Sequence, residues 1–182
     1  MRRFGFSLAA ALAAFAGHAE PYEDPLLRLE IPPGFQGPVS GSQDASTEIV
    51  AFRWPYPAGD ASTLLQITKY HFGLMLAEMP EEERGRAAQY YLQQFLGGIA
   101  RRRSAFTSSE PVRVDLDGQP GAKVSWEGLA QGRRLTGVMY CVIVGTTVVS
   151  FHTQDFDPVP LALRDAIVRS LESVVWRNSS RP

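Results

Sequence analysis

Residues 148–158, VVSFHTQDFDP, place an imidazole and two carboxylates within six positions, at His152, Asp155 and Asp157. Imidazole and carboxylate groups are the usual materials of general acid–base catalysis and of zinc sites. A β-strand, however, directs successive side chains to opposite faces of a sheet, so neighbouring residues of one strand do not converge on a point. We therefore interpret this stretch as the end of a strand that leads into a helix, and not as an active site.

Each polar residue of this stretch has a structural interpretation. Asp157-Pro158 is typical of a helix start, with aspartate as the N-cap and proline at the first helical position. Such a cap contributes about 1 kcal/mol. Asp155 is expected in the loop before that helix. His152 is expected on the strand face that also carries Val148 and Ser150.

Metal-binding and catalytic motifs are absent from the sequence. It contains no Gly-x-Ser-x-Gly, HExxH, Cys-x-x-Cys, glycine-rich phosphate loop or EF-hand loop. A zinc site built from His71, His152 and Asp155 would require the strands expected over 62–72 and 147–153 to be neighbours, and no ligand spacing supports it. We therefore expect no metal, no cofactor and no enzymatic activity.

A second candidate site is the stretch AFRWPYP, residues 51–57. Strand alternation places Phe52, Trp54 and Tyr56 on one face and Arg53 on the other. Aromatic side chains with a nearby arginine can stack on a sugar or anchor a protein partner, although aromatic residues at strand spacing also pack in cores. Because Trp54 and Tyr56 lie at a strand end beside a Pro/Gly loop, we predict Arg53, Trp54 and Tyr56 as binding residues.

The remaining reactive or charged groups have simpler interpretations. Cys141 is the single cysteine and lies in the apolar run VMYCVIVG, which predicts a buried, unreactive thiol. Arg101, Arg102 and Arg103 suit the C-terminal end of a helix, and GRR at 132–134 suits a solvated turn.

The first residues have the three parts of a secretory signal peptide. Arg2 and Arg3 form a basic region, residues 4–15 are apolar, and Gly17-His18-Ala19 is a small-x-small cleavage site. We expect a signal peptide over 1–19 and a single α/β domain over 20–182, which is periplasmic or extracellular. The expected cleavage removes two arginines and no acidic residue from a chain of net charge −1, so no basic surface for nucleic acid is expected. No transmembrane segment is expected in the mature chain.

Hydrophobic periodicity predicts an α+β fold. Strands are expected over 26–31, 48–54, 62–72, 112–116, 122–128, 134–144 and 147–153, and residues 36–47 read as a loop. A long helix begins near Pro80, and a second helix closes the chain after Asp157. The fold class is therefore an antiparallel sheet of about six to seven strands with a long middle helix and a C-terminal helix packed on it.

The order of these elements resembles a known family. LRLEIPPGF, LLQITKYHF, VRVDLDGQPGAKVSWEG, VMYCVIVGTTVVSFHT and ALRDAIVRSLESVVW follow one another in the pattern of the PsbP/Mog-type (DcrB-like) α/β/α sandwich. The resemblance covers nearly the whole predicted mature chain, and it implies the fold and a non-enzymatic role. No residue role carries over from the family.

Three functions are consistent with this sequence. The first is an exported accessory or protein-binding domain, such as a chaperone-like adaptor or an inhibitor of a secreted protein, whose partner is another protein of the envelope or secreted fraction. The second is a periplasmic protein that binds a small ligand or glycan through Trp54 and Tyr56. The third is a hydrolase without a recognisable motif, which would need a pocket that unites His152 with a carboxylate.

Overall fold

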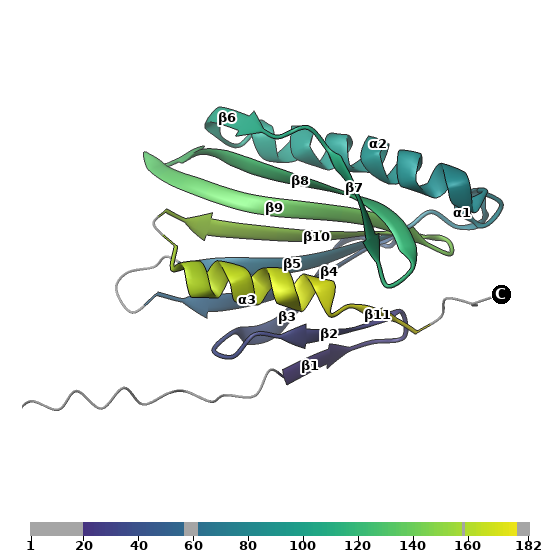
Figure 1. Ribbon diagram of the computed structural model, residues 1–182, viewed down its shortest axis with the longest axis horizontal. Coiled ribbons are helices and arrows are strands. Elements are labelled where there is room, and N and C mark those ends of the chain that lie inside the picture. Colours follow the sequence, from purple (N-terminus) through teal and green to yellow (C-terminus); the bar gives the residue numbers. More distant parts are fainter. Residues whose placement is uncertain (1–19, 57–61, 158, 178–182) are drawn as a thin grey trace, which may run out of the picture.

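An antiparallel sheet of eight strands forms the centre of the protein, with a helix on each of its faces (Figure 1). The computed structural model describes residues 20–56, 62–157 and 159–177, so the predicted signal peptide lies outside the described residues. The strands are β1 (Glu20–Glu23), β2 (Leu27–Ile31), β3 (Gln36–Asp44), β4 (Thr47–Pro55), β5 (Ser62–His71), β6 (Ser104–Ser108), β7 (Val112–Leu116), β8 (Gln119–Ala130), β9 (Arg133–Val144), β10 (Thr147–Phe156) and β11 (Val175–Trp176). The helices are α1 (Leu74–Ala77), α2 (Glu81–Ala100) and α3 (Leu161–Glu172).

The main sheet has the strand order β3-β4-β5-β10-β9-β8-β6, and β7 also pairs with β8. β7, β8, β9 and β10 follow one another as an antiparallel meander, which confirms the predicted order of strands. β4 and β5, both predicted as strands, pair with each other as a hairpin. β9 lies near the middle of the sheet and is buried on both faces over its second half, which explains the continuous apolar run of its sequence.

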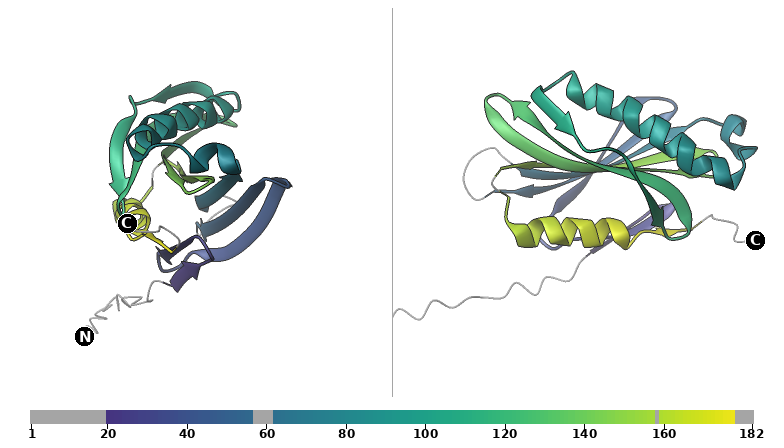
Figure 2. Two further views of the ribbon diagram at one scale, coloured as in Figure 1. Left: turned by 90° about the vertical axis from the view of Figure 1, so that its right-hand side faces the viewer. Right: turned by 45° about the horizontal axis from the view of Figure 1, so that its top comes forward.

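The two faces of the sheet are covered differently. α2 packs on one face, over β8, β9 and β10. The other face is covered by α3 and by a small sheet in the order β1-β2-β11. Figure 2 shows the main sheet curving between these two layers. The predicted fold class, an antiparallel sheet with a middle helix and a C-terminal helix packed on it, is therefore confirmed.

Each layer has its own hydrophobic core. Beneath α2, Ala88 and Leu92 recur at helical spacing and are fully buried against the sheet. Cys141 lies in this core with no exposed surface, and burial raises the pKa of its thiol. The predicted unreactive cysteine is thus explained by its surroundings.

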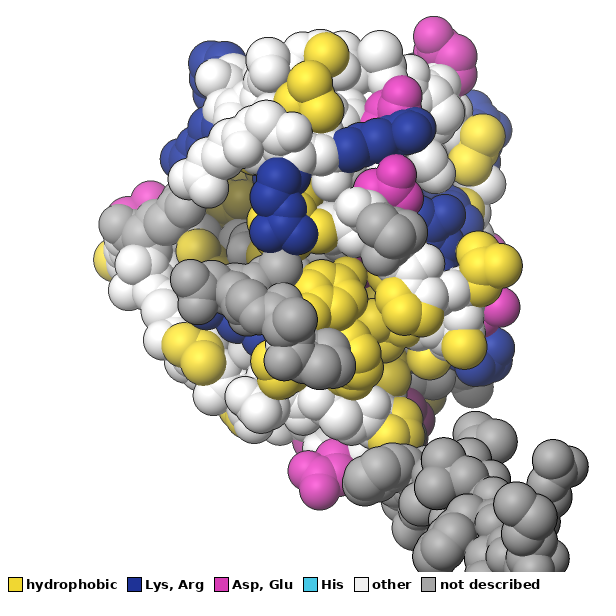
Figure 3. Space-filling model, turned by 90° about the vertical axis from the view of Figure 1, so that its left-hand side faces the viewer, with side chains coloured by type: hydrophobic (Ala, Val, Ile, Leu, Met, Phe, Trp, Pro, Cys, Tyr) yellow, Lys and Arg dark blue, Asp and Glu magenta, His cyan; other side chains and the backbone are white. Residues whose placement is uncertain are grey.

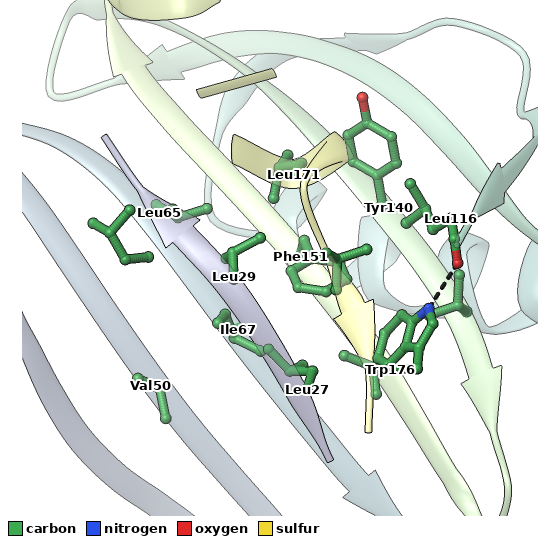
Figure 4. Packing of buried hydrophobic residues seen from close by; sticks show 14 of the residues in the cluster. Leu27, Leu29, Val50, Leu65, Ile67, Leu116, Tyr140, Phe151, Leu171 and Trp176 are labelled. Atoms are coloured by element: carbon green, nitrogen blue, oxygen red, sulfur yellow. Dashed lines mark hydrogen bonds between the residues drawn. The ribbon is translucent and has the colours of Figure 1, made fainter. Parts of the chain in front are cut away.

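The second core lies between the main sheet, α3 and the small sheet (Figure 4). Phe151 of β10 meets Leu29 of β2 and Leu171 of α3 there. Trp176 of β11 donates a hydrogen bond from its indole Nε1 to the carbonyl of Leu116, at 2.6 Å. This bond ties the C-terminal segment to the end of β7.

The predictions for residues 36–47 and for Asp157 were wrong. Residues 36–47, predicted as a loop, contain β3, an edge strand that pairs only with β4. α3 begins at Leu161, with Pro160 at its N-cap position and no side-chain cap, so Asp157 is not the cap of this helix. Asp157 is instead exposed, and its Oδ2 lies 3.8 Å from Nη1 of Arg134.

Neither α2 nor α3 has the length and apolar character needed to cross a membrane, and the same is true of every helix within the described residues.

Candidate functional site

His152 and Asp155 occupy opposite faces of β10. His152 lies on the α2 face, only 8% exposed, with its ring 5.5 Å from that of Trp126. Burial, assisted by the positive charge of Arg103, lowers the pKa of His152 to about 3. The imidazole is therefore neutral near pH 7, and within the described residues its Nε2 has no hydrogen-bond partner. Because Asp155 lies on the opposite face of the sheet, the two side chains do not form an acid–base pair.

The zinc site considered from the sequence is not formed. β5 and β10 are neighbours, as that site required, but their register places His71 opposite Thr147 and His152 opposite Gln66. His71 is exposed, and its Nδ1 lies 3.1 Å from the hydroxyl of Thr147. No group of three or more His, Cys, Asp or Glu side chains that could hold a metal is found in the part of the chain that the structure describes.

The predicted binding residues of β4 are only partly brought together. The rings of Trp54 and Tyr56 are half-buried and meet edge to face, with centroids 5.5 Å apart. The Tyr56 hydroxyl lies 3.0 Å from that of Thr63. Arg53 is exposed, and alternation along β4 places it on the opposite face of the sheet. A ligand that contacts Trp54 and Tyr56 would therefore not contact Arg53. The binding role of these three residues stays a prediction.

A row of polar side chains crosses the main sheet on the α3 face. The register of the strands places Asp155 of β10 opposite Thr136 of β9, Thr136 opposite Glu127 of β8, and Glu127 opposite Thr107 of β6. Polar residues at these positions leave this corner of the sheet without the apolar surface that α3 covers elsewhere. The row therefore forms the floor of a cleft.

The cleft has a volume of about 620 Å³ and lies between this row and α3. Ile167, Val168 and Leu171 of α3 give it one apolar wall. Arg164 reaches from the first turn of the helix across to the floor, where its Nη2 donates a hydrogen bond to the Thr136 hydroxyl at 3.1 Å. A cavity of this size suits a small ligand.

The other arginine of the cleft is already paired. Nη2 of Arg134 lies 2.5 Å from Oε2 of Glu127, and the same guanidinium faces Asp157. The sequence interpretation of residues 132–134 as a solvated turn therefore missed that Arg134 lines the cleft. Figure 3, a view of the end where β10 ends and α3 begins, shows basic and acidic side chains side by side above a central group of hydrophobic ones.

Asp155 is the most unusual group of the cleft. Its side chain is 3% exposed, and within the described residues its Oδ1 has no hydrogen-bond partner. Burial raises the pKa of this carboxyl, while a hydrogen bond from Thr63 and the charge of Arg164 oppose that increase. Asp155 was predicted in a loop, but it lies inside β10 and lines the cleft.

A surface at the other end of the sheet combines several exposed hydrophobic side chains. We call Phe72, Met75, Tyr90 and Tyr91 the aromatic corner; Phe72 follows β5, Met75 lies in α1, and the two tyrosines lie in the middle of α2. Met75 is 77% exposed and Tyr90 is 60% exposed. Ring centroids are 5.2 Å apart for Phe72–Tyr91 and 5.7 Å apart for Tyr90–Tyr91. Figure 1 shows α1 at the right-hand end of the sheet, away from the start of α3.

Sequence reasoning missed both features. The predicted long helix contains Tyr91, but the sequence gave no sign that the chain after β5 would bring Phe72 against it. A signal was present for the cleft, because Thr153, Asp155 and Asp157 alternate in sequence and therefore share one face of the strand.

No family model and no curated protein matches the chain. Solved structures do match it. CyanoP, the PsbP of the cyanobacterium Synechocystis, aligns with a TM-score of 0.61 at 10% identity, covering 93% of this chain and 98% of its own. The protein has a PsbP-like fold.

Two further proteins share the PsbP-like fold. LpqN of Mycobacterium tuberculosis, involved in cell envelope biogenesis, aligns with a TM-score of 0.58 at 15% identity, covering 86% of this chain and 89% of its own. PA94 of Pseudomonas aeruginosa, a protein of unknown function described as a candidate regulator, aligns with a TM-score of 0.53 at 16% identity, covering 91% of this chain and 99% of its own. At such identities the likeness concerns the fold, and function must be argued from the surface of this chain.

Proposed function

We propose that the protein is an exported, non-enzymatic accessory protein that binds another protein of the envelope or secreted fraction through the aromatic corner. The exposure of Met75 and Tyr90 at one corner carries this proposal. The other large hydrophobic side chains that are exposed in the described residues lie singly on separate elements: Val39 on β3, Val112 on β7, Leu161 on α3 and Val175 on β11. Grouped exposed apolar side chains are typical of interaction sites, whereas single ones are normal on any surface.

The aromatic corner is held rigidly from beneath. The ring of Tyr91 stacks on that of Phe95, which in turn stacks on Tyr70 at 4.7 Å. Leu76 of α1 is buried in the core under α2, so it fixes the short helix that presents Met75. A partner would therefore meet a Tyr91 ring that is held in place by its neighbours.

Acidic residues surround the aromatic corner along the chain. Glu78 follows α1, and Glu81, Glu82 and Glu83 form the exposed first turn of α2. Charged residues at the rim of an interface select a partner of opposite charge. The partner surface proposed here therefore has an apolar centre with lysine or arginine around it.

Export and the absence of enzymatic activity are parts of the same proposal. The signal-peptide pattern of residues 1–19 supports export, as does the fold shared with LpqN, a protein involved in cell envelope biogenesis. Separation of His152 from Asp155 by the sheet argues against the hydrolase that the sequence left open.

Site-specific photo-cross-linking tests the proposed docking surface. A photoreactive phenylalanine is placed at Tyr90 in one variant and at Leu161, which is 74% exposed on α3, in a control. We expect a discrete adduct with one protein of the envelope or secreted fraction from position 90, and none from position 161. Adducts of the same size from both positions, or none from position 90, would refute the proposed surface.

A further inference from the structure

The cleft under α3 contains a buried carboxylate whose hydrogen bonding is only partly satisfied. Asp155 is 3% exposed and lines the cleft, and its Oδ1 accepts no hydrogen bond from the described residues. Leaving a buried acceptor without a donor costs free energy, because the oxygen has lost its hydrogen bonds to water. A ligand that brings a donor to this oxygen would recover that free energy.

The charges of the cleft favour a cationic donor. Three carboxylates line it, from Glu127, Asp155 and Asp157, against the two guanidinium groups of Arg134 and Arg164. Arg134 is occupied by Glu127 and Asp157. The lining therefore favours a positively charged group, and Asp155 is the one of these three carboxylates without an ion pair in the described part of the chain.

Arg164 supplies donors next to that position. Its guanidinium carries five N–H groups, of which the bond to Thr136 uses one. Thr136 is the direct cross-strand neighbour of Asp155, so the donors of Arg164 and the acceptor of Asp155 lie side by side on the floor. An acceptor close to the cationic group of a ligand would be held by Arg164.

The third contact is apolar. Ile167, Val168 and Leu171 face the cleft from α3, with Val138 on the floor. Such a wall holds an aliphatic group through the removal of apolar surface from water.

We propose that the cleft binds a ligand with a protonated α-amine, a neighbouring carbonyl or carboxylate, and an aliphatic side chain. Asp155 accepts hydrogen bonds from the ammonium group, Arg164 donates to the carbonyl or carboxylate oxygen, and the side chain packs on Ile167 and Leu171. This chemistry belongs both to free aliphatic amino acids and to the N-terminus of a short peptide. The Ser125 hydroxyl, which also lines the cleft, could bond to a peptide group of the second kind of ligand.

Other ligand classes fit less well. A sugar would leave the charge of Asp155 unbalanced, and the Trp126 ring that could stack on it packs on the opposite face against Phe106 and His152. A purely anionic ligand would meet three carboxylates, while Arg134 is already neutralised.

Calorimetric titration of the mature protein with L-leucine, Leu-Gly-Gly and N-acetyl-Leu-Gly-Gly tests this inference. We expect saturable binding of a compound with a free amine, and acetylation should weaken it at least tenfold, which corresponds to ~1.4 kcal/mol. Tighter binding of Leu-Gly-Gly than of leucine assigns the site to peptides, and the reverse order assigns it to free amino acids. Equal binding of the acetylated and free peptides, or no binding of either amine at millimolar concentration, would overturn the proposal.

Two matched variants connect the binding to Asp155. Asp155→Asn should weaken binding of the free amine at least about tenfold and leave the acetylated peptide unaffected, because the ammonium loses its charged partner. Asp165→Asn, the same change at an exposed position of α3, should bind as the wild type does. Thermal melts verify that both variants are folded. A folded Asp155→Asn variant that retains wild-type affinity would also overturn the proposal.

Discussion

His152 and Asp155 are three residues apart in β10, yet the main sheet separates their side chains. The imidazole lies against Trp126 beneath α2, and the carboxylate lines the cleft beneath α3. Two residues whose spacing in the sequence suggests a catalytic site therefore lie in two unrelated environments. One stabilises a neutral ring in a core, and the other leaves an acceptor available to a ligand.

The buried histidine predicts a loss of stability in mild acid. The folded-state pKa of His152 is lowered from 6.5 to about 3 by burial and by Arg103. Below pH 6.5 the unfolded chain therefore binds a proton that the folded chain does not, and stability falls by about 1.4 kcal/mol per pH unit from this group. Denaturant unfolding between pH 6 and 4 should show a smaller slope for His152→Leu than for the wild type. Parallel slopes, or an NMR titration of His152 near its ordinary pKa, would contradict this.

The ion pair between Asp24 and Lys69 should be important for stability. Asp24 Oδ2 lies 2.6 Å from Lys69 Nζ, and Lys69 is only 3% exposed. Asp24→Ala leaves a buried ammonium without its close partner and should cost about 3–5 kcal/mol. Glu48 contacts the same ammonium at 3.2 Å but is half-exposed, so Glu48→Ala should cost at most ~1 kcal/mol. Chemical denaturation of both variants measures the difference, and equal losses would refute the assignment.

The same pair predicts a second, more acidic transition. Burial raises the pKa of Asp24, but hydrogen bonds from Lys69, Tyr22 and the backbone N–H groups of Leu26 and Leu27 outweigh burial and hold it below the ordinary value. The contribution of ionised Asp24 to the free energy of unfolding is therefore fully present above the unfolded-state pKa near 3.8. It is lost as the pH falls through the folded-state pKa. Asp24→Asn should remove this transition from the acid-unfolding curve.

Gly137 should tolerate no side chain. A Cβ atom there would lie 2.1 Å from the carbonyl oxygen of Thr153 and 2.5 Å from the Trp126 ring. Gly137→Ala must therefore displace β10 or the indole, and we expect a loss of ~1–3 kcal/mol. Gly41→Ala on the edge strand β3 meets no atom within 4 Å and is the control, with a change below ~1 kcal/mol. Differential scanning calorimetry of the two variants measures this difference. Equal melting temperatures would contradict the expected intolerance at Gly137.

Truncation of Trp54 and Tyr56 distinguishes a contact surface from core packing. Both rings are half-buried, whereas Phe52 on the same face is 4% exposed and belongs to the core. Trp54→Ala and Tyr56→Ala should each cost clearly less than the ~3–5 kcal/mol expected for Phe52→Ala. If thermal melts show equal losses for all three variants, the binding role predicted for Trp54 and Tyr56 should be abandoned.

The sequence predicted the parts of the fold that have strong periodicity. Apolar alternation identified β2, β4 and β5, and the continuous apolar run identified the central strand β9. β3 was missed because an edge strand with one neighbour needs no apolar face, and its sequence, QGPVSGSQD, has none. Asp157 was misplaced because a local Asp-Pro signal does not reveal that the chain runs on to Pro160 before α3 begins.

The cleft could be predicted only in part, because the alternation of Thr153, Asp155 and Asp157 places them on one strand face but does not show which strands lie beside it. Thr107, Glu127, Thr136 and Asp155 become neighbours only through the register of four strands. No spacing along the chain encodes that register. In the same way, Phe72 and Tyr91 are brought together by the turn through α1, which the sequence did not predict.

The affinity of the protein captured at position 90 is the most direct test of the central proposal. Met75→Ser and Tyr90→Ser should each weaken that complex by about thirtyfold, equivalent to ~2 kcal/mol for an anchor residue. Leu161→Ser removes an equally exposed side chain outside the aromatic corner and should leave the dissociation constant unchanged. Because all three residues are exposed, all three variants should melt as the wild type does. Wild-type affinity in the first two variants, or an equal loss in Leu161→Ser, would contradict the docking surface proposed here.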